Sequence, residues 1–299
     1  MNSFNDMMET LRGSEKRNIA VACAQDYDVL AAVENARKLG IANAILVGDA
    51  REIRDIAGKN CIDPGNYEVV DIEDKNEAAR EAVRLVSSGQ ADTLMKGIIG
   101  TADFLRAVLN KEIGLRTGRT LSHVAVFEVP QPHRLMLLSD AAMVMNPDLK
   151  AKVDIILNAA QVARKIGIPK PKVAALAAVE VVNPDMQATL DAAALAKMSD
   201  RGQFKDILVD GPLALDNAIS MDAAKHKGIV SEVAGRADML LTPNIEAGNV
   251  LYKAITDFAG FKMSGIVMGA KAPIILTSRS DSDEAKLNSI VLATLVSSK

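Results

Sequence analysis

Residues 276–282, Leu-Thr-Ser-Arg-Ser-Asp-Ser, place hydroxyl, guanidinium and carboxylate groups directly after an apolar run. Arg279 carries a permanent planar charge that suits a phosphate, and the hydroxyl of Ser278 can donate to an oxygen that gains negative charge. Lys271 stands upstream of the same apolar run. We therefore predict an anion site here, with Ser278 and Arg279 as catalytic groups and Lys271 as a substrate-binding cation.

The same stretch also allows a purely structural interpretation. A helical pattern begins near Asp283, so that Ser282 or Asp283 could cap its start, with Arg279 paired to Asp281. Residue types and spacing alone leave the two interpretations open.

A second motif, Met-Lys-Gly-Ile-Ile-Gly-Thr-Ala-Asp at 95–103, has the pattern of a strand, a glycine-containing loop and a helix. Such a loop can present backbone N–H groups and a helix N-terminus to a phosphate, with Lys96 as counter-charge. We predict Gly100 and Thr101 at this site, with Thr101 as the helix cap, and Arg106 on the same helix. The alternative is an ordinary strand-to-helix turn, since the motif matches neither common nucleotide-binding loop.

Two further polar residues are predicted to bind substrate. Arg134 flanks the turn of a predicted hairpin formed by residues 122–129 and 134–140. Asn249 follows Gly248 in the first turns of a predicted helix. Glycine destabilises a helix at such a position, so we expect that another backbone or a ligand approaches Gly248 closely.

Composition narrows the classes of function. The net charge is −3 and the pI is near 5.7, so no overall basic field attracts nucleic acid or a membrane surface. No stretch approaches the ~18 apolar residues of a membrane span, and we expect a cytoplasmic protein. Cys23 and Cys61 lack the spacing of a disulfide framework, and the three histidines lack metal-ligand spacing. We expect neither a metal nor a bound cofactor.

Apolar runs alternate with helical patterns along the whole chain, which predicts an α/β fold with mostly parallel sheets. The turn signal Asn-Pro-Asp at 146–148 suggests that the middle of the chain forms a separate lobe. We predict one discontinuous lobe, residues 1–143 plus 268–299, and a second lobe, residues 144–267. A cleft between lobes is the default ligand site.

Three runs resemble those of the phosphate acyltransferases, in the same order along the chain. They are Met-Lys-Gly-Ile-Ile-Gly-Thr-Ala-Asp-Phe-Leu-Arg-Ala-Val-Leu from residue 95, Leu-Leu-Ser-Asp-Ala-Ala-Met-Val-Met-Asn-Pro-Asp from residue 137, and the segment from residue 246 to about 293. The likeness covers about residues 15–299 and is greatest for the butyryltransferase branch. It implies two lobes of the isocitrate/isopropylmalate dehydrogenase-like type, with the active site in the cleft between them.

The resemblance also implies an activity and roles for residues. Family members move an acyl group between coenzyme A and inorganic phosphate, and their Ser-Arg pair and helix arginine map onto Ser278, Arg279 and Arg106. In the acetyltransferase branch an aspartate seven residues after the serine is the proposed base for the CoA thiol, but Ala285 stands at that position here. The neighbouring acidic residues are the candidates for this role: Asp281, Asp283 and Glu284.

We therefore expect a butyryl-type acyltransferase that works by direct attack in a ternary complex, because no cysteine is placed as a nucleophile. Coenzyme A is then a substrate, and the resemblance implies a homodimer or higher homo-oligomer. The alternatives are a phosphate acetyltransferase, a metal- and NAD-dependent dehydrogenase, or a non-enzymatic module that binds CoA or phosphate.

Overall fold

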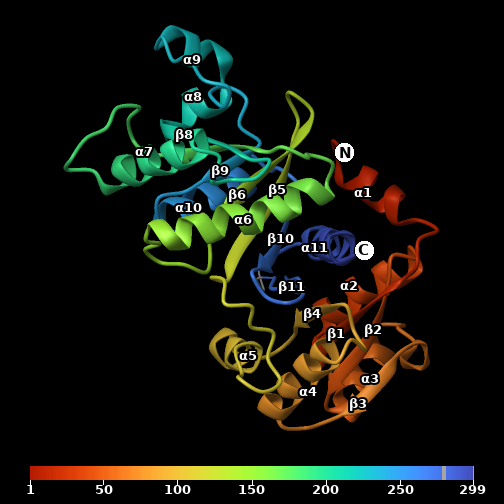
Figure 1. Ribbon diagram of the computed structural model, residues 1–299. Helices are drawn as coiled ribbons and strands as arrows, with labels where there is room; N and C mark the ends of the chain where they lie inside the picture. Colours follow the sequence, from red (N-terminus) through yellow and green to blue (C-terminus); the bar gives the residue numbers. More distant parts are fainter. Residues whose placement is uncertain (278–280, 299) are drawn as a thin grey trace. The chain divides into compact units, whose positions relative to one another are not determined.

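The computed structural model describes residues 1–277 and 281–298 and divides the chain into two compact units. The terminal unit comprises Phe4–Arg119 and Ser264–Lys299, and the middle unit comprises Met1–Ser3 and Thr120–Met263. Each unit combines helices with a mostly parallel sheet, as predicted (Figure 1).

In the terminal unit the strands lie in the order β3-β2-β1-β4-β11-β10; β10 is antiparallel to its neighbour β11, and the other described pairs are parallel. Their bounds are β1 (Arg17–Ala22), β2 (Ala42–Gly48), β3 (Glu68–Asp71), β4 (Thr93–Lys96), β10 (Met263–Met268) and β11 (Ile274–Ile275). The helices are α1 (Phe4–Leu11), α2 (Tyr27–Lys38), α3 (Ala50–Lys59), α4 (Lys75–Ser87), α5 (Thr101–Val108) and α11 (Asp283–Ser297), with a short 3-10 turn η1 (Pro64–Asn66). Helices α2 and α11 pack against each other, whereas α4 packs with α5.

Aspartates set the start of three helices in this unit. The carboxylate of Asp26 accepts one backbone N–H from the first turn of α2, and those of Asp49 and Asp74 each accept two from the first turns of α3 and α4. These bonds satisfy donors that the helix itself leaves free. Every one of these helices therefore begins at a defined point just beyond the carboxyl end of a strand or its following loop.

The order of the strands creates a switch point beside β1. The chain passes from β1 to β2 and β3 on one side and then returns to place β4 on the other side of β1. In open α/β sheets, ligands bind outside the carboxyl ends of the strands at such a point, because the connecting loops diverge there. A ligand site is therefore expected at the carboxyl ends of β1 and β4.

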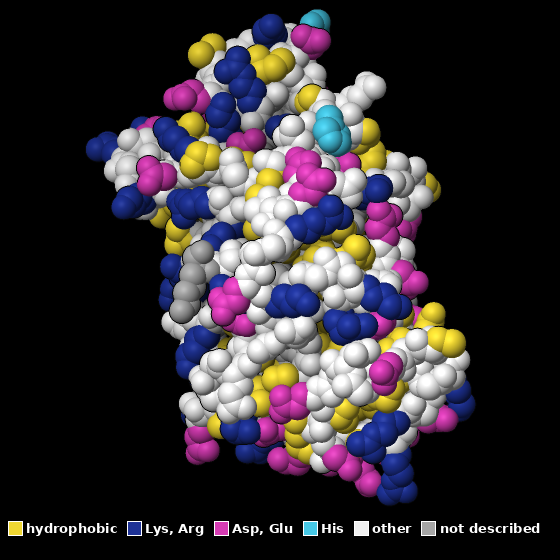
Figure 2. All heavy atoms as spheres, turned by 90° about the vertical axis from the view of Figure 1, so that its right-hand side faces the viewer, with side chains coloured by type: hydrophobic (Ala, Val, Ile, Leu, Met, Phe, Trp, Pro, Cys, Tyr) yellow, Lys and Arg dark blue, Asp and Glu magenta, His cyan; other side chains and the backbone are white. Residues whose placement is uncertain are grey.

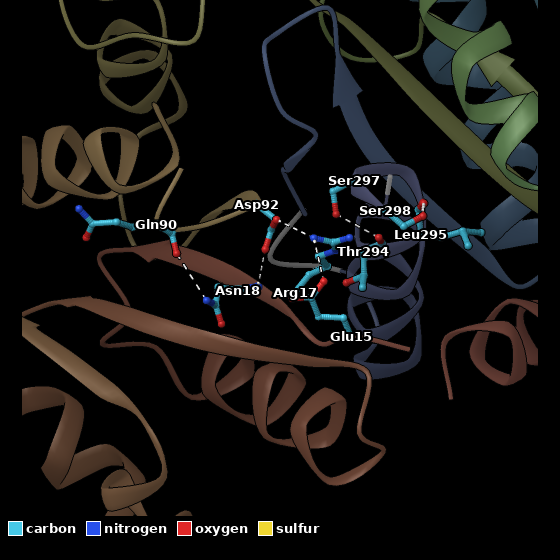
Figure 3. Close-up of polar contacts among 9 residues, drawn as sticks. All are labelled: Glu15, Arg17, Asn18, Gln90, Asp92, Thr294, Leu295, Ser297 and Ser298. Atoms are coloured by element: carbon cyan, nitrogen blue, oxygen red, sulfur yellow. Dashed lines mark hydrogen bonds and ion pairs between the residues drawn. The ribbon is translucent and has the colours of Figure 1, made fainter. Parts of the chain in front are cut away.

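The opposite, amino edge of this sheet carries a structural polar network (Figure 3). Asp92 accepts the backbone N–H of Asn18 at 2.9 Å and pairs with the guanidinium of Arg17 at 3.3 Å. Ser297 and Ser298, at the end of α11, donate to carbonyls of their own last turn. The contacts of Asp92 connect β1 to the segment before β4. The two serine hydroxyls satisfy backbone carbonyls at the end of α11.

In the middle unit the strands lie in the order β5-β6-β9-β7-β8. Their bounds are β5 (Ser122–Val129), β6 (Arg134–Ser139), β7 (Lys172–Leu176), β8 (Leu208–Leu213) and β9 (Met239–Leu241). The helices are α6 (Leu149–Lys165), α7 (Gln187–Asp200), α8 (Leu215–Ile219), α9 (Met221–His226) and α10 (Ile245–Lys253), the last followed by a π-helical turn, η2 (Ala254–Phe258). Strands β5 and β6 form the predicted antiparallel hairpin, and the other pairs are parallel.

The compact units differ from the predicted lobes at their first boundary. We expected the first lobe to extend to residue 143, but residues 120–143 lie in the middle unit. The reason is that β6 pairs in parallel with β9, so the hairpin completes the sheet of the middle unit. The return to the terminal unit, after Met263, lies four residues before the predicted one.

A buried ion pair connects two helices of the middle unit. Nζ of Lys152, on α6, lies 2.5 Å from Oδ2 of Asp191 on α7, and the two side chains are 5% and 11% exposed. Gln187 donates to the other carboxylate oxygen of Asp191. The pair lines a small pocket at the carboxyl ends of β7 and β9.

Charges of both signs are distributed over the protein surface. On the face drawn in Figure 2, Lys and Arg side chains are interspersed with Asp and Glu, and hydrophobic side chains show between them. Within the described residues, no helix is both long and apolar enough to cross a membrane.

Candidate functional site

The sheet of the terminal unit brings the two predicted motifs to the same edge. Strand β11 pairs in parallel with β4, with Ile274 opposite Leu94 and Ile275 opposite Met95. Lys96 and Thr277 therefore both leave the sheet at its carboxyl edge, next to the switch point. Ser278 and Arg279, which follow Thr277 in the sequence, lie outside the described residues.

Gly97 allows the loop after β4 to pack directly on the end of β1. A Cβ at this position would lie 2.1 Å from the carbonyl oxygen of Cys23, a distance no side chain tolerates. The N–H groups of Gly97 and Ile98 donate to the carbonyls of Ala22 and Cys23 at 2.8 and 2.9 Å. This close approach explains the first glycine of the motif and fixes the path of the loop.

Helix α5 begins at the end of this loop. Its N-cap is Gly100 and Thr101 is its first residue, so the prediction that Thr101 is the cap is wrong by one position. Within the described residues no side chain caps this helix start, and Gly100 and Thr101 are both exposed. Because Gly100 has no side chain, the backbone N–H groups at the start of α5 stay accessible and can donate to an anion. Nζ of Lys96 lies 3.2 Å from the carbonyl oxygen of Gly97, at the base of the loop.

Arg106 forms an ion pair within α5. Its Nη1 lies 2.6 Å from Oδ1 of Asp103, one turn earlier, and its side chain is 73% exposed. The carboxylate of Asp103 lies close to Gly100, at the start of the helix. A phosphate at this helix start would therefore compete with Asp103 for the guanidinium.

The start of α11 confirms one part of the purely structural interpretation, namely that Ser282 can cap this helix. Ser282 is the N-cap, and its hydroxyl accepts the N–H of Ala285 at 3.1 Å. Asp283 and Glu284 are exposed in the first turn, and Asp281 is half-buried just before the cap. Ala285, the residue at the family's aspartate position, is buried.

Lys271 lies at the other end of β11. The loop that contains it runs from β10 to the start of β11, whereas the Ser-Arg motif follows the end of that strand. Its backbone N–H donates to the carbonyl of Leu115, and its Nζ lies 3.5 Å from the carbonyl oxygen of Gly114. The described contacts of Lys271 hold this loop against residues 114–115.

Arg134 likewise begins a strand and does not end one. It is the first residue of β6, and its guanidinium lies 3.7 Å from Asp238, the residue before β9. Since β6 and β9 are parallel, this pair lies at the amino edge of the middle unit's sheet, away from the carboxyl edge where ligands bind in such sheets.

Gly248 and Asn249 lie on α10 and contact the loop at the carboxyl end of β6, in the middle unit. A Cβ on Gly248 would lie 2.1 Å from the carbonyl oxygen of Asp140, which confirms the predicted close approach and identifies the approaching group as backbone. Nδ2 of Asn249 donates to the carbonyl of Ala141 at 3.2 Å. The carboxylate of Asp140 accepts the backbone N–H groups of Ala142 and Met143, which fixes this loop.

Cys23 does not have the surroundings of a nucleophile. Cys23 is buried at the end of β1, and its Sγ donates to the carbonyl of Lys75 at 3.4 Å. Burial raises the pKa of its thiol to about 11, because a buried thiolate loses the solvation of its charge. Cys61 is exposed in a loop. Among the residues that the structure describes, no group of three or more His, Cys, Asp or Glu could hold a metal ion.

Two comparisons with known proteins decide the family. The model of the family described as "Phosphate acetyl/butaryl transferase" matches residues 3–84 and 74–294. The phosphate butyryltransferase of Clostridium acetobutylicum is 56% identical over 294 residues, which is 98% of this chain and 98% of that protein. The chain belongs to this family.

Solved structures support the fold of this family member. A branched-chain phosphotransacylase from Enterococcus faecalis is 35% identical, with a TM-score of 0.83 over 94% of this chain and 99% of that chain. A 4-hydroxythreonine-4-phosphate dehydrogenase from Klebsiella pneumoniae is 15% identical, with a TM-score of 0.58 over 95% of this chain and 100% of that chain. The second likeness concerns the fold alone, and it agrees with the dehydrogenase-like α/β fold expected from the sequence.

One buried charged residue near the site was not predicted. Lys286 occupies the second turn of α11, and its side chain is 4% exposed. The sequence contains no clear signal for it, because Lys286 stands among the polar residues at the start of α11, whose apolar run begins only at Ile290.

Proposed function

We propose that this chain is a phosphate acyltransferase of the butyryl type, which transfers a short acyl group between coenzyme A and inorganic phosphate. Membership of the family supports this reaction. The observation that carries the site is the parallel pairing of β4 with β11, since it brings the loop after Lys96 and the chain entering the Ser-Arg motif to one edge of a sheet.

The anionic reactants explain why cations are needed at this edge. Phosphate and CoA both carry negative charge, so their encounter is repelled unless positive groups neutralise it. Lys96 and the uncapped start of α5 supply such groups among the described residues, and Arg279 adds a guanidinium by its place in the sequence. Arg106 joins them when it exchanges Asp103 for a phosphate oxygen.

The acyl group moves directly between the two substrates in this proposal. The phosphate oxygen attacks the thioester carbonyl, the C–S bond breaks, and the CoA thiolate leaves and takes up a proton. Ser278 donates to the carbonyl oxygen as it gains charge or to the leaving sulfur, and Asp281, Asp283 or Glu284 exchanges the thiol proton. The buried, high-pKa thiol of Cys23 supports a route without an acyl-enzyme.

The remaining expectations stay proposals of the same kind. We infer a preference for butyryl or branched short chains, because the two phosphotransacylases compared above are named for such groups. Each methylene is worth only ~1 kcal/mol in a pocket, so acetyl transfer is the alternative to measure. The proposal further includes catalysis without a metal, a homodimer or larger homo-oligomer, and a cytoplasmic location.

A thiol-release assay tests the function. Butyryl-CoA is incubated with the protein, with and without inorganic phosphate, and the free CoA thiol is measured. Phosphate-dependent release supports the transferase, whereas binding of CoA without any release favours a non-enzymatic module. Repeating the assay with acetyl-, butyryl- and isobutyryl-CoA then ranks the acyl chains.

A further inference from the structure

Helix α10 and the turn η2 that continues it form a surface element of the middle unit. Among the residues of α10, all of which the structure describes, only Gly248 is buried, and it lies against the carbonyl of Asp140. The ring of Tyr252 packs on β5, with its centroid 5.9 Å from that of His123 and 5.8 Å from that of Phe127. Gly248 and Tyr252 thus define the side of the helix that faces the sheet, and the opposite side is turned to solvent.

The solvent side of this helix carries a row of apolar side chains, which we call the apolar stripe. Its members recur at intervals of three or four residues and therefore lie along one side of the helix: Ala247, Val250, Ala254 and Phe258. Val250 is 70% exposed and Phe258 is 94% exposed. Single exposed apolar residues are common on protein surfaces, whereas a continuous row of them marks a surface that another molecule covers.

Two opposite charges flank the apolar stripe. Glu246 and Lys253 are seven residues apart, which is about two helical turns, so both lie on the same flank. Among the described residues neither side chain forms an ion pair, and the described contact of the Lys253 ammonium is with the ring of Tyr252, at 5.8 Å. The flank therefore offers one carboxylate and one ammonium group to a molecule that covers the stripe.

A second copy of the chain complements this pattern of charges. When two copies of α10 pack antiparallel about a two-fold axis near Val250, the stripes face each other, and Glu246 of each copy lies opposite Lys253 of the other. A parallel pair brings like charges together instead. A partner surface of a single charge sign satisfies only one of the two groups, so the sign and spacing of these charges favour the antiparallel copy.

We propose that the apolar stripe of α10 and η2 is the interface between two copies of this chain, packed antiparallel with Glu246 of one copy opposite Lys253 of the other. The proposed function includes a homo-oligomer, and this inference assigns a surface to it. The inference rests on the exposed side chains of one helix, so it does not depend on the acyl transfer.

A charge placed in the stripe tests the surface. Val250→Glu brings two carboxylates together at the two-fold axis, so we expect the dissociation constant of the assembly to rise at least ~100-fold, the scale of losing a central contact in both copies. Val230→Glu is the matched control, because Val230 is 100% exposed in the same unit, between α9 and β9. Sedimentation equilibrium of the full-length chain at several concentrations gives the dissociation constant, and circular dichroism establishes folding.

Charge reversal tests whether the occupant is a second copy. Glu246→Lys leaves two lysines opposite each other and Lys253→Glu leaves two glutamates, so each variant alone should weaken association roughly 10-fold. The double variant Glu246→Lys/Lys253→Glu restores opposite charges and should associate like wild type. An equimolar mixture of the two single variants should associate as well, because each chain then supplies the charge that the other lacks.

Weaker association of Val250→Glu but not of Val230→Glu, with recovery in the double variant and in the mixture, supports the interface. Equal association of Val250→Glu and Val230→Glu overturns it, and so does a double variant that associates no better than the single ones. A wild-type chain that remains at 31.8 kDa at every concentration also overturns it and leaves the stripe to a protein of different sequence. These measurements need no substrate, so a protein without phosphate-dependent thiol release would refute the proposed function and leave this test unaffected.

Discussion

At the scale of single residues, Arg279 is the side chain on which the proposed chemistry depends most. Replacing it with alanine removes a permanent charge and two or more donors from the phosphate, so we expect kcat/KM to fall at least ~100-fold. Lysine at this position should recover part of the loss, because it restores the charge but not the planar fork. Initial rates of phosphate-dependent thiol release measure both variants.

The matched control for Arg279 is Arg51→Ala, since Arg51 is 88% exposed on α3. This control should remain within threefold of wild type. An Arg279→Ala enzyme within threefold of wild type would remove Arg279 from the site.

The cysteines test the route of transfer. We expect the double variant Cys23→Ala/Cys61→Ser to keep its turnover when folded, because one thiol is buried with a pKa of about 11 and the other lies exposed in a loop. Circular dichroism establishes folding and the thiol-release assay measures turnover. A folded double variant without activity would point to an acyl-enzyme instead.

At the scale of elements, the buried ion pair between α6 and α7 should make the middle unit sensitive to the loss of either charge alone. Lys152→Met leaves Asp191 buried and charged without its partner, which typically costs about 3–5 kcal/mol in the free energy of unfolding. The double variant Lys152→Met/Asp191→Leu removes both charges and should recover most of this loss. Urea unfolding measures each variant, and equal losses in the single and double variants would contradict this explanation.

Strand pairing also decides how much of the site can be predicted from the sequence. The apolar runs and polar strand ends were sufficient to predict the α/β class and to select both motifs. The parallel pairing of β4 with β11 could not be deduced, because residues 96 and 276 are 180 positions apart and nothing local specifies which strands are neighbours. Lys271 and Arg134 were selected for their charge and for their places beside predicted strands, and the structure places each of them before its strand, at the amino end.

At the scale of the whole molecule, local sequence patterns predict the division into units only in part. The discontinuous arrangement could be anticipated from the alternation of strands and helices and from the turn signal at 146–148. The first boundary could not, because the β5–β6 hairpin is defined by its partner β9, about a hundred residues later.

Glu34 should contribute strongly to the acid stability of the terminal unit. Its side chain is 6% exposed, Arg37 donates two hydrogen bonds to its carboxylate, and Tyr67 donates a third at 2.5 Å. The bonds from Arg37, aided by Tyr67 and Lys38, lower the pKa of Glu34 to about 2 from an ordinary value of 4.5. As the pH falls, the carboxylate of Glu34 is therefore protonated at a higher pH in the unfolded chain than in the folded protein.

The sign of the pH dependence follows from this lowered pKa. The contribution of Glu34 is fully present above pH ~4.5 and is lost as the pH falls toward about 2. It amounts to about 3–4 kcal/mol at most, since the pKa falls from 4.5 to about 2 and each pKa unit corresponds to ~1.4 kcal/mol. We expect Glu34→Gln to lower the free energy of unfolding at pH 7 and to reduce its slope between pH 4.5 and 2. Glu77→Gln, at an exposed position on α4, is the control, and urea unfolding at several pH values should show parallel curves for the control and wild type but a flatter one for Glu34→Gln.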